Sequence, residues 1–126
     1  EVDKGATTIW EGWDAIKPDT GELGLKSLNH YAPGAAAAWL FSHCCGIRPG
    51  KPGFREILIA PVPGGSLSWA KAEYNSAAGK IGAAWKLEEG KFILDVLIPE
   101  GVTATVQMPD GTVYEKALTG SYTCGK

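Results

Sequence analysis

The sequence predicts a mainly β fold, in which a short helical segment precedes a C-terminal antiparallel β-sandwich. From residue 54 onward, short apolar segments alternate with turns every several residues, as in sandwich domains. One apolar run, at about residues 34–45, has the length and flanking residues of a helix. The 126 residues suit about one domain, and the hydrophobic fraction of 44% is ordinary for a globular chain.

The chain changes character near residues 46–53, which are rich in glycine and proline. We therefore expect a first region, residues 1–50, of loops and one helix, and a second region, residues 51–126, of strands. Within the first region, residues 17–28 are polar and turn-rich and read as an exposed loop.

The predicted helix begins near Pro33, which favours a first helical turn, and stops at Gly46, which suits a C-terminal cap. Its apolar residues cover every face: Ala35, Ala36, Ala37, Ala38, Trp39, Leu40 and Phe41. A helix that is apolar all round belongs inside a larger structure. Because no second amphipathic helix follows, the segment either lacks its natural neighbours or packs on the sheet.

The second region reads as seven or so strands joined by turns. A bulge is expected near Ala70 or Lys71, because Leu67 and Trp69 share one parity while Ala72 and Tyr74 share the other. The expected strands are residues 54–60, 67–74, 81–87, 92–98, 102–108, 113–117 and 122–124.

Composition excludes several classes of function. The net charge of −2 gives no electrostatic case for nucleic acid or an anionic membrane surface. No apolar run is long enough to span a bilayer, and the N-terminal residues lack the pattern of a signal peptide. Because the chain begins at Glu1 rather than at a Met, we interpret it as a processed or excised piece. The spacing of Cys44, Cys45 and Cys124 is not that of a zinc site, so we interpret all three as packing residues. They do not indicate the cellular compartment of the protein. No metal or organic cofactor is required.

The strongest chemical signal is Glu11, which lies between Trp10 and Trp13, with a second acid at Asp14. Indole rings stack on the apolar faces of sugars, and they can desolvate an acid between them in a way that favours proton transfer. This pattern favours a carbohydrate site. The alternative is a buried Trp pair with a solvated Glu between them.

The order of motifs resembles the C-terminal end of bacterial α-L-rhamnosidases of glycoside hydrolase family 78. The resemblance covers nearly the whole chain, with the motifs in the same order. The sequence departs from the family pattern at Gly12, where a larger side chain is frequent, and in the plain run Ala36–Ala38. It implies that residues 1–50 close an (α/α)6 barrel and residues 51–126 form a C-terminal sandwich. The matching segments are Gly5–Trp13, Ser27–Ala32, Pro52–Pro61, Leu67–Ala72, Gly79–Ile81, Trp85–Lys86 and Ile98–Val106.

The resemblance also implies a chemistry. Such enzymes invert the anomeric centre with two carboxyls, and Glu11 matches the general base, with the general acid outside this chain. Trp10 and Trp13 would shape the sugar pocket or simply pack the barrel. His30 matches a histidine that hydrogen-bonds rhamnose, the alternative being a surface or capping residue. The implied partners are rhamnose-containing glycosides or polysaccharides and the rest of the barrel, with the chain alone inactive.

Two other functions compete with the enzyme reading. The sandwich could be a carbohydrate-binding module that uses Trp69 or Trp85 as a stacking platform, although Trp85 shares a face with Ile81, Ala83 and Leu87 that looks like core. An exposed coplanar pair of aromatic side chains would favour this function. The sandwich could also be purely structural, since no cluster of titratable groups occurs in residues 54–126.

Overall fold

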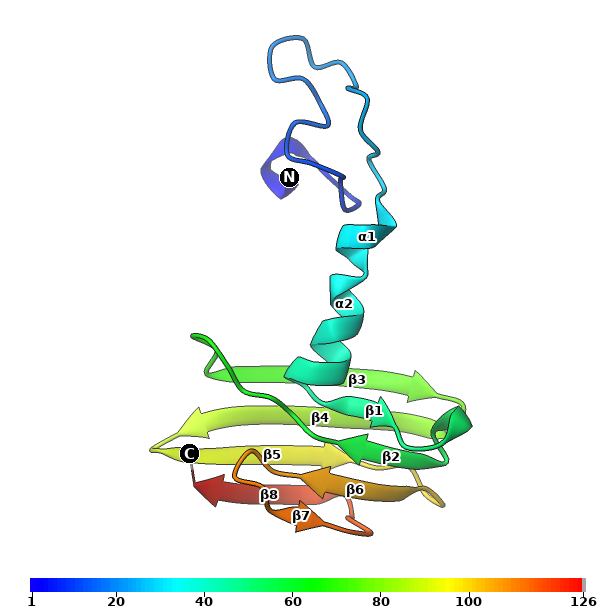
Figure 1. The fold of residues 1–126 in the computed structure, drawn as a ribbon, viewed down its shortest axis with the longest axis vertical. Helices are drawn as coiled ribbons and strands as arrows, with labels where there is room; N and C mark the ends of the chain where they lie inside the picture. The colour runs from blue at the N-terminus through cyan, green and yellow to red at the C-terminus, as the bar shows by residue number, and fades with distance from the viewer. Residues whose placement is uncertain (126) are drawn as a thin grey trace. The chain divides into compact units, whose positions relative to one another are not determined.

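The computed structural model describes residues 1–125, which form two compact units (Figure 1). The first unit comprises residues 1–38 and the second begins at Trp39. The mainly β fold with a C-terminal sandwich is confirmed.

The first unit is mostly loop. A 3-10 turn at Val2–Lys4 opens the chain, and an isolated antiparallel bridge pairs Ile16 with Leu23. Two stretches, residues 9–11 and 27–30, lie side by side because backbone N–H groups of each bond to carbonyls of the other. Trp10 and Ala15 are its buried apolar residues. The loop is therefore held mainly by hydrogen bonds rather than by a core.

The predicted helix is present but segmented, and it begins three residues earlier than expected. It comprises α1 (Tyr31–Gly34), α2 (Ala36–Trp39) and η2 (Leu40–Cys44). The η2 turn is π-helical: the Cys45 N–H donates to the Leu40 carbonyl, five residues back, at 3.0 Å. Residues 35–41 are all exposed. The apolar surface expected to lie inside a larger structure is thus uncovered in this chain.

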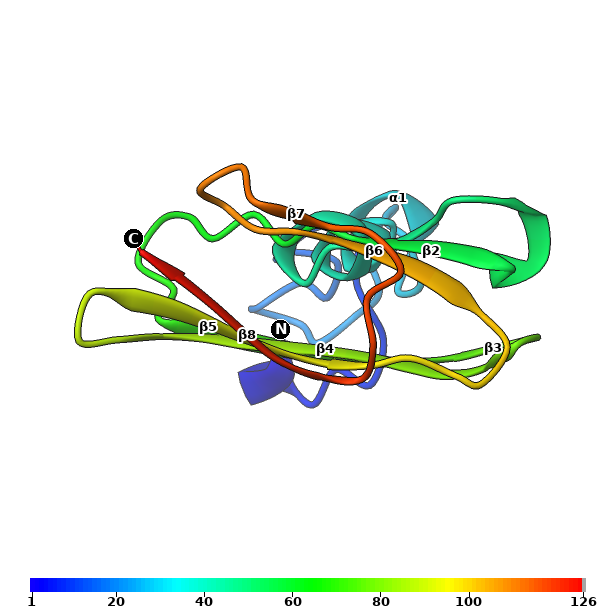
Figure 2. The same cartoon turned by 90° about the horizontal axis from the view of Figure 1, so that it is seen from below.

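The second unit is a sandwich of two four-stranded sheets, which Figure 2 shows as two layers. One sheet has the order β1-β2-β6-β7 and the other β3-β4-β5-β8. All pairs are antiparallel except β2 with β6, which run parallel because the chain crosses to the other sheet between them. A 3-10 turn, η3 (Pro52–Phe54), precedes β2. The strands are β1 (Ile47–Pro49), β2 (Glu56–Ile59), β3 (Trp69–Ser76), β4 (Gly79–Glu88), β5 (Lys91–Leu97), β6 (Thr103–Gln107), β7 (Val113–Tyr114) and β8 (Gly120–Gly125).

Two expectations about the strands were wrong. The β3–β4 register runs without interruption from Trp69 opposite Lys86 to Ser76 opposite Gly79, so β3 contains no bulge. The apparent change of parity arises because Trp69 lies on the outer face, whereas Ala70 and Ala72 pack against the core. In addition, β1 was not predicted, because its residues lie in the glycine- and proline-rich stretch 46–53.

The core of the second unit lies between the sheets. Its largest fully buried side chains come from both layers: Ile57, Ile59, Val106 and Met108 on one side and Ile81, Phe92 and Leu94 on the other. Trp85 is 2% exposed and stacks on Phe92 with ring centroids 5.4 Å apart. Its indole N–H donates to the Cys44 carbonyl at 2.7 Å. This hydrogen bond ties the end of η2 to the centre of β4.

Gly46 makes the turn from η2 into β1. It has a φ of +77°, and a Cβ there would lie 2.2 Å from the carbonyl carbon of Ala60. Only glycine permits both this backbone conformation and this close approach. The predicted end of the helix at Gly46 is therefore confirmed.

Candidate functional site

Glu11 is anchored by a residue 16 positions away. The Glu11 N–H donates to the Ser27 carbonyl at 2.9 Å, and the Ser27 N–H donates to the Glu11 carboxylate Oε2 at 2.8 Å. The side chain is exposed. Its position is thus fixed through one carboxylate oxygen, and within residues 1–125 no hydrogen bond occupies the other.

The two indoles beside Glu11 occupy opposite environments. Trp10 is buried, and its backbone N–H donates to the Glu1 carboxylate at 3.2 Å. Trp13 is 76% exposed, and its carbonyl accepts a hydrogen bond from Lys4 Nζ at 3.1 Å. In this chain the flanking rings therefore leave the Glu11 carboxylate in contact with water.

Asp14 forms an ion pair of its own. Lys26 Nζ lies 2.5 Å from Asp14 Oδ1, and this hydrogen bond holds the pKa of the Asp14 carboxyl below its ordinary value of 3.8. A Cβ at residue 12 would lie 3.0 Å from Lys26 Nζ and 3.1 Å from Asp14 Oδ1. The absence of a side chain at Gly12 thus leaves room for this pair.

His30 lies next to the Glu11 stretch. Its backbone N–H donates to the Ile9 carbonyl at 2.8 Å, and its ring stacks on Tyr31 with centroids 5.8 Å apart. It occupies the N-cap position of α1 without a capping hydrogen bond from its side chain. Its Nδ1 is buried and has no hydrogen-bond partner within the part of the chain described. A capping role thus does not account for this side chain.

The structure brings Trp10, Glu11 and His30 onto the two paired stretches of the first unit. Sequence reasoning missed Ser27 as the residue that holds Glu11, and Lys26 as the partner of Asp14. Both lie more than ten positions from their partners, so no local spacing indicates them. The only signal was that Ser27 opens one of the matching segments.

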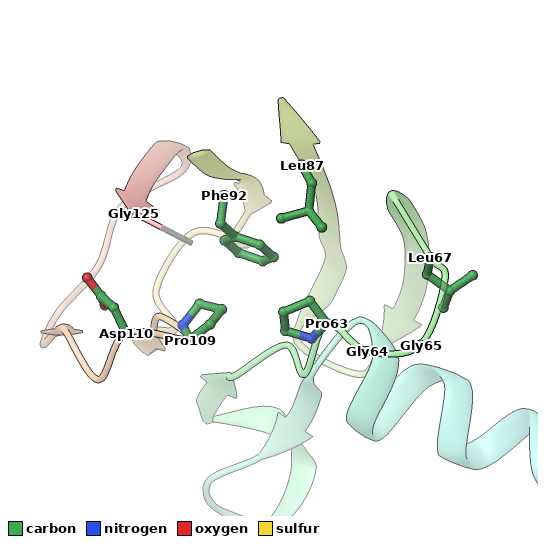
Figure 3. A pocket seen from close by; sticks show the side chains of 9 residues that line it. All are labelled: Pro63, Gly64, Gly65, Leu67, Leu87, Phe92, Pro109, Asp110 and Gly125. Atoms are coloured by element: carbon green, nitrogen blue, oxygen red, sulfur yellow. The ribbon is translucent and has the colours of Figure 1, made fainter. Parts of the chain in front are cut away.

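The second unit has hollows, and the one shown in Figure 3 has a single titratable side chain, that of Asp110, among its described lining residues. One cavity of about 260 Å³ opens at the end of the sandwich, where Leu87 and Phe92 face Pro63 and Pro109 (Figure 3). Asp110, at its rim, accepts a hydrogen bond from the Thr112 N–H at 2.9 Å, which lowers the pKa of that carboxyl. The carboxylate therefore has a structural role in its own turn.

The two tryptophans and Cys45 of the second unit occupy different environments. Trp85 is buried, and Trp69, although exposed, has no stacked aromatic partner among the described residues. Burial, and then the neighbouring Cys44, raise the pKa of the Cys45 thiol to about 11.

In residues 1–125 no group of three His, Cys, Asp or Glu side chains is placed to hold a metal ion. None of the helices in that range has the length and apolarity needed to cross a bilayer.

Two family models divide the chain between them. Residues 1–44 match the bacterial alpha-L-rhamnosidase 6 hairpin glycosidase domain, and residues 46–122 match the bacterial alpha-L-rhamnosidase C-terminal domain. The chain belongs to the bacterial alpha-L-rhamnosidase family. The exposed apolar helix, residues 31–44, lies within the segment that matches the glycosidase domain.

Curated relatives agree with this assignment. An alpha-L-rhamnosidase of Streptomyces avermitilis is 40% identical over 110 residues, which are 86% of this chain and 11% of the relative. An alpha-L-rhamnosidase of Formosa agariphila is 34% identical over 128 residues, covering 99% of this chain and 14% of the relative. The chain thus spans 11–14% of the length of these rhamnosidases.

Solved structures give the same result. The crystal structure of Streptomyces avermitilis alpha-L-rhamnosidase complexed with L-rhamnose matches 97% of this chain and 14% of that chain, with a TM-score of 0.79 and 35% identity. The native enzyme of Aspergillus terreus matches 99% of this chain and 15% of that chain, with a TM-score of 0.82 and 33% identity. The fold of this chain is therefore shared with segments of much longer alpha-L-rhamnosidase chains.

Proposed function

We propose that this chain is the C-terminal part of an inverting α-L-rhamnosidase and that Glu11 is its general base. The observation that supports this most is the anchoring of Glu11: the Ser27 N–H holds one carboxylate oxygen at 2.8 Å and leaves the other free to accept a proton. The substrates would be terminal α-L-rhamnosyl residues of glycosides or polysaccharides, the class that the relatives' names indicate.

The chemistry requires a second acid. Inversion uses two carboxyls roughly 6.5–9.5 Å apart, one of which protonates the leaving oxygen while the other takes a proton from the attacking water. We place the first of these acids on glycosidase-domain polypeptide that this chain lacks. The exposure of Glu11 fits this arrangement, because the missing polypeptide would also enclose the site and exclude bulk water.

We propose that three neighbouring side chains recognise the sugar. His30 Nδ1 is buried and has no hydrogen-bond partner among residues 1–125, so it needs a partner from outside them, and we propose that a sugar hydroxyl is that partner. Trp13 exposes its indole, which can stack on an apolar sugar face. Trp10 is buried beneath the same stretch and shapes the pocket by fixing the backbone on which Glu11 lies.

We further propose that residues 1–50 complete the catalytic (α/α)6 barrel and that residues 51–126 are a structural sandwich. The matches of the two family models, which meet between residues 44 and 46, support this division. The burial of Trp85 argues against its use as a sugar platform in the competing carbohydrate-binding function.

The test is Glu11→Gln in a full-length rhamnosidase that carries this segment. We expect kcat on an aryl rhamnoside to fall by about 10²–10⁴-fold, the usual contribution of a general base, with little change in the Kd for rhamnose. Asp14→Asn is the matched control, because Asp14 is an exposed acid three residues away that is paired with Lys26. Activity near wild type for the Gln variant would exclude the assignment.

The chain alone should be inactive, because its general base has no general acid opposite it. Incubating the 126-residue chain with the same aryl rhamnoside tests this directly. Turnover that copurifies with the chain and disappears in Glu11→Gln would contradict the proposed division of the catalytic pair.

A further inference from the structure

Four large apolar side chains gather beside the free edge of β3 in the second unit. They line a hollow of about 630 Å³ that runs along this strand from Ser66 to Glu73. All four are exposed, and we call them the β3 edge patch: Leu40 (51%), Phe41 (40%), Leu67 (49%) and Trp69 (67%). Contiguous exposed apolar surface of this kind marks an interaction site.

The outer edge of the strand next to the patch has no strand partner among residues 1–125. β3 is the outermost strand of its sheet, and the Ser68 carbonyl accepts a hydrogen bond from the Leu87 N–H at 2.8 Å. In an antiparallel pair such bonds occur at alternate residues. The N–H and C=O groups of Trp69, Lys71, Glu73 and Asn75 therefore point away from β4. An exposed strand edge beside apolar side chains attracts another polypeptide.

The opposite edge of the same sheet is different. There β8 exposes the polar side chains of Ser121 and Thr123. Both β3 and β8 are outer strands of the same sheet, but the four side chains of the β3 edge patch lie beside β3 alone. The position at a sheet edge therefore does not by itself explain these side chains. The patch is specific to the side on which η2 enters the sandwich.

The β3 edge patch lies next to the junction between the two matched domains. Leu40 and Phe41 lie within the segment that matches the glycosidase domain, a few residues before the junction with the C-terminal domain. The chain spans 11–14% of its relatives, so most of the polypeptide joined at this junction lies outside it. A domain tethered so close to the patch meets it at high effective concentration.

We propose that the β3 edge patch seats glycosidase-domain polypeptide that this chain lacks, which fixes the sandwich to the catalytic domain. The apolar side chains would pack against that polypeptide, and the free groups of β3 would be shielded from water. This surface does not depend on the role proposed for Glu11, and it gives the sandwich a positioning task in the complete enzyme.

Amide hydrogen exchange tests the occupant. We compare peptides that cover residues 66–76 and residues 120–125 in the 126-residue chain and in a full-length enzyme that contains it. Exchange at the β3 edge should slow on the order of tenfold in the full-length enzyme, while exchange at the β8 edge changes little. Equal exchange of the β3 peptide in both proteins would overturn the proposal.

A pair of substitutions separates this occupant from a second copy of the chain. Trp69→Ser removes the centre of the patch, whereas Leu118→Ser removes a side chain that is 77% exposed in the loop before β8. In the full-length enzyme Trp69→Ser should lower the Tm more than Leu118→Ser, and in the short chain both should have little effect. If the short chain is a dimer by light scattering and Trp69→Ser makes it monomeric, a second copy is the occupant and the proposal fails.

Discussion

Replacing Trp85 with Phe should destabilise the sandwich more than any exposed aromatic substitution. The indole N–H donates to the Cys44 carbonyl at 2.7 Å inside the core, and phenylalanine has no donor. A buried carbonyl left without its donor costs about 1–3 kcal/mol. The smaller ring also loses apolar burial worth about 1–2 kcal/mol, so we expect a total loss of about 2–5 kcal/mol.

Urea unfolding of the chain, followed by far-UV circular dichroism, measures this loss through the strands. Trp69→Phe is the control, because Trp69 is exposed and its substitution should change the free energy of unfolding by less than about 0.5 kcal/mol. If Trp85→Phe costs no more than Trp69→Phe, the hydrogen bond between β4 and η2 does not stabilise the fold as we argue.

Two further substitutions test a close backbone approach and an ion pair. Gly46→Ala and Gly101→Ala both place a side chain at a φ of +77°, but only at residue 46 would the Cβ lie 2.2 Å from the backbone of Ala60. In the same urea experiment, Gly46→Ala should lower the free energy of unfolding by about 1–3 kcal/mol more than Gly101→Ala does. Equal losses in the two variants would contradict the close approach. Lys26→Met should raise the pKa of Asp14 toward 3.8, as measured by NMR titration of its carboxyl carbon, since the Lys26 hydrogen bond lowers it. Because the folded pKa is the lower one, the pair stabilises the fold above about pH 3.8 and stops doing so as the pH falls through the folded pKa. An unchanged Asp14 pKa in the variant would show that the ion pair does not form in solution.

The strands could be predicted where the signal is local. The β4–β5 hairpin follows from strict alternation on both sides of a turn at Glu89 and Gly90, which adopt φ values of +49° and +75°. By contrast, β1 is short, ends at Pro49 and pairs with β2 through Ile47 opposite Ile59. Nothing in its own residues distinguishes it from a linker, because the partner that makes it a strand lies further along the chain.

The topology needed information that a linear pattern does not contain. The parallel pairing of β2 with β6 brings Ile57 beside Ala104 after the chain has built most of the other sheet. The wrongly predicted bulge in β3 has a related cause. Its parity argument assumed that Trp69 faces the core, whereas the structure places this indole outside, where we propose that another domain covers it.

The candidate site shows the same limit. The cluster of Trp10, Glu11 and Trp13 is visible in the sequence because its members are consecutive or nearly so. The residue that fixes the carboxylate, Ser27, is not visible, because its role arises only when two loop stretches pair. A motif can therefore identify the acid, but the geometry that would make the acid useful depends on the folded loop.

The two units are stabilised differently, and this difference bears on how the site would work. The sandwich buries apolar side chains from both sheets, whereas the first unit buries only Trp10 and Ala15 within residues 1–38 and exposes Trp13, Leu25 and Tyr31. A segment with so little core cannot hold a catalytic carboxylate rigidly by its own packing. The rigidity must come from hydrogen bonds such as that between Ser27 and Glu11, and from the barrel that we propose surrounds it. Glu11 would therefore be positioned accurately only when the exposed apolar surface of the first unit is covered, which links its use as a base to assembly of the complete domain.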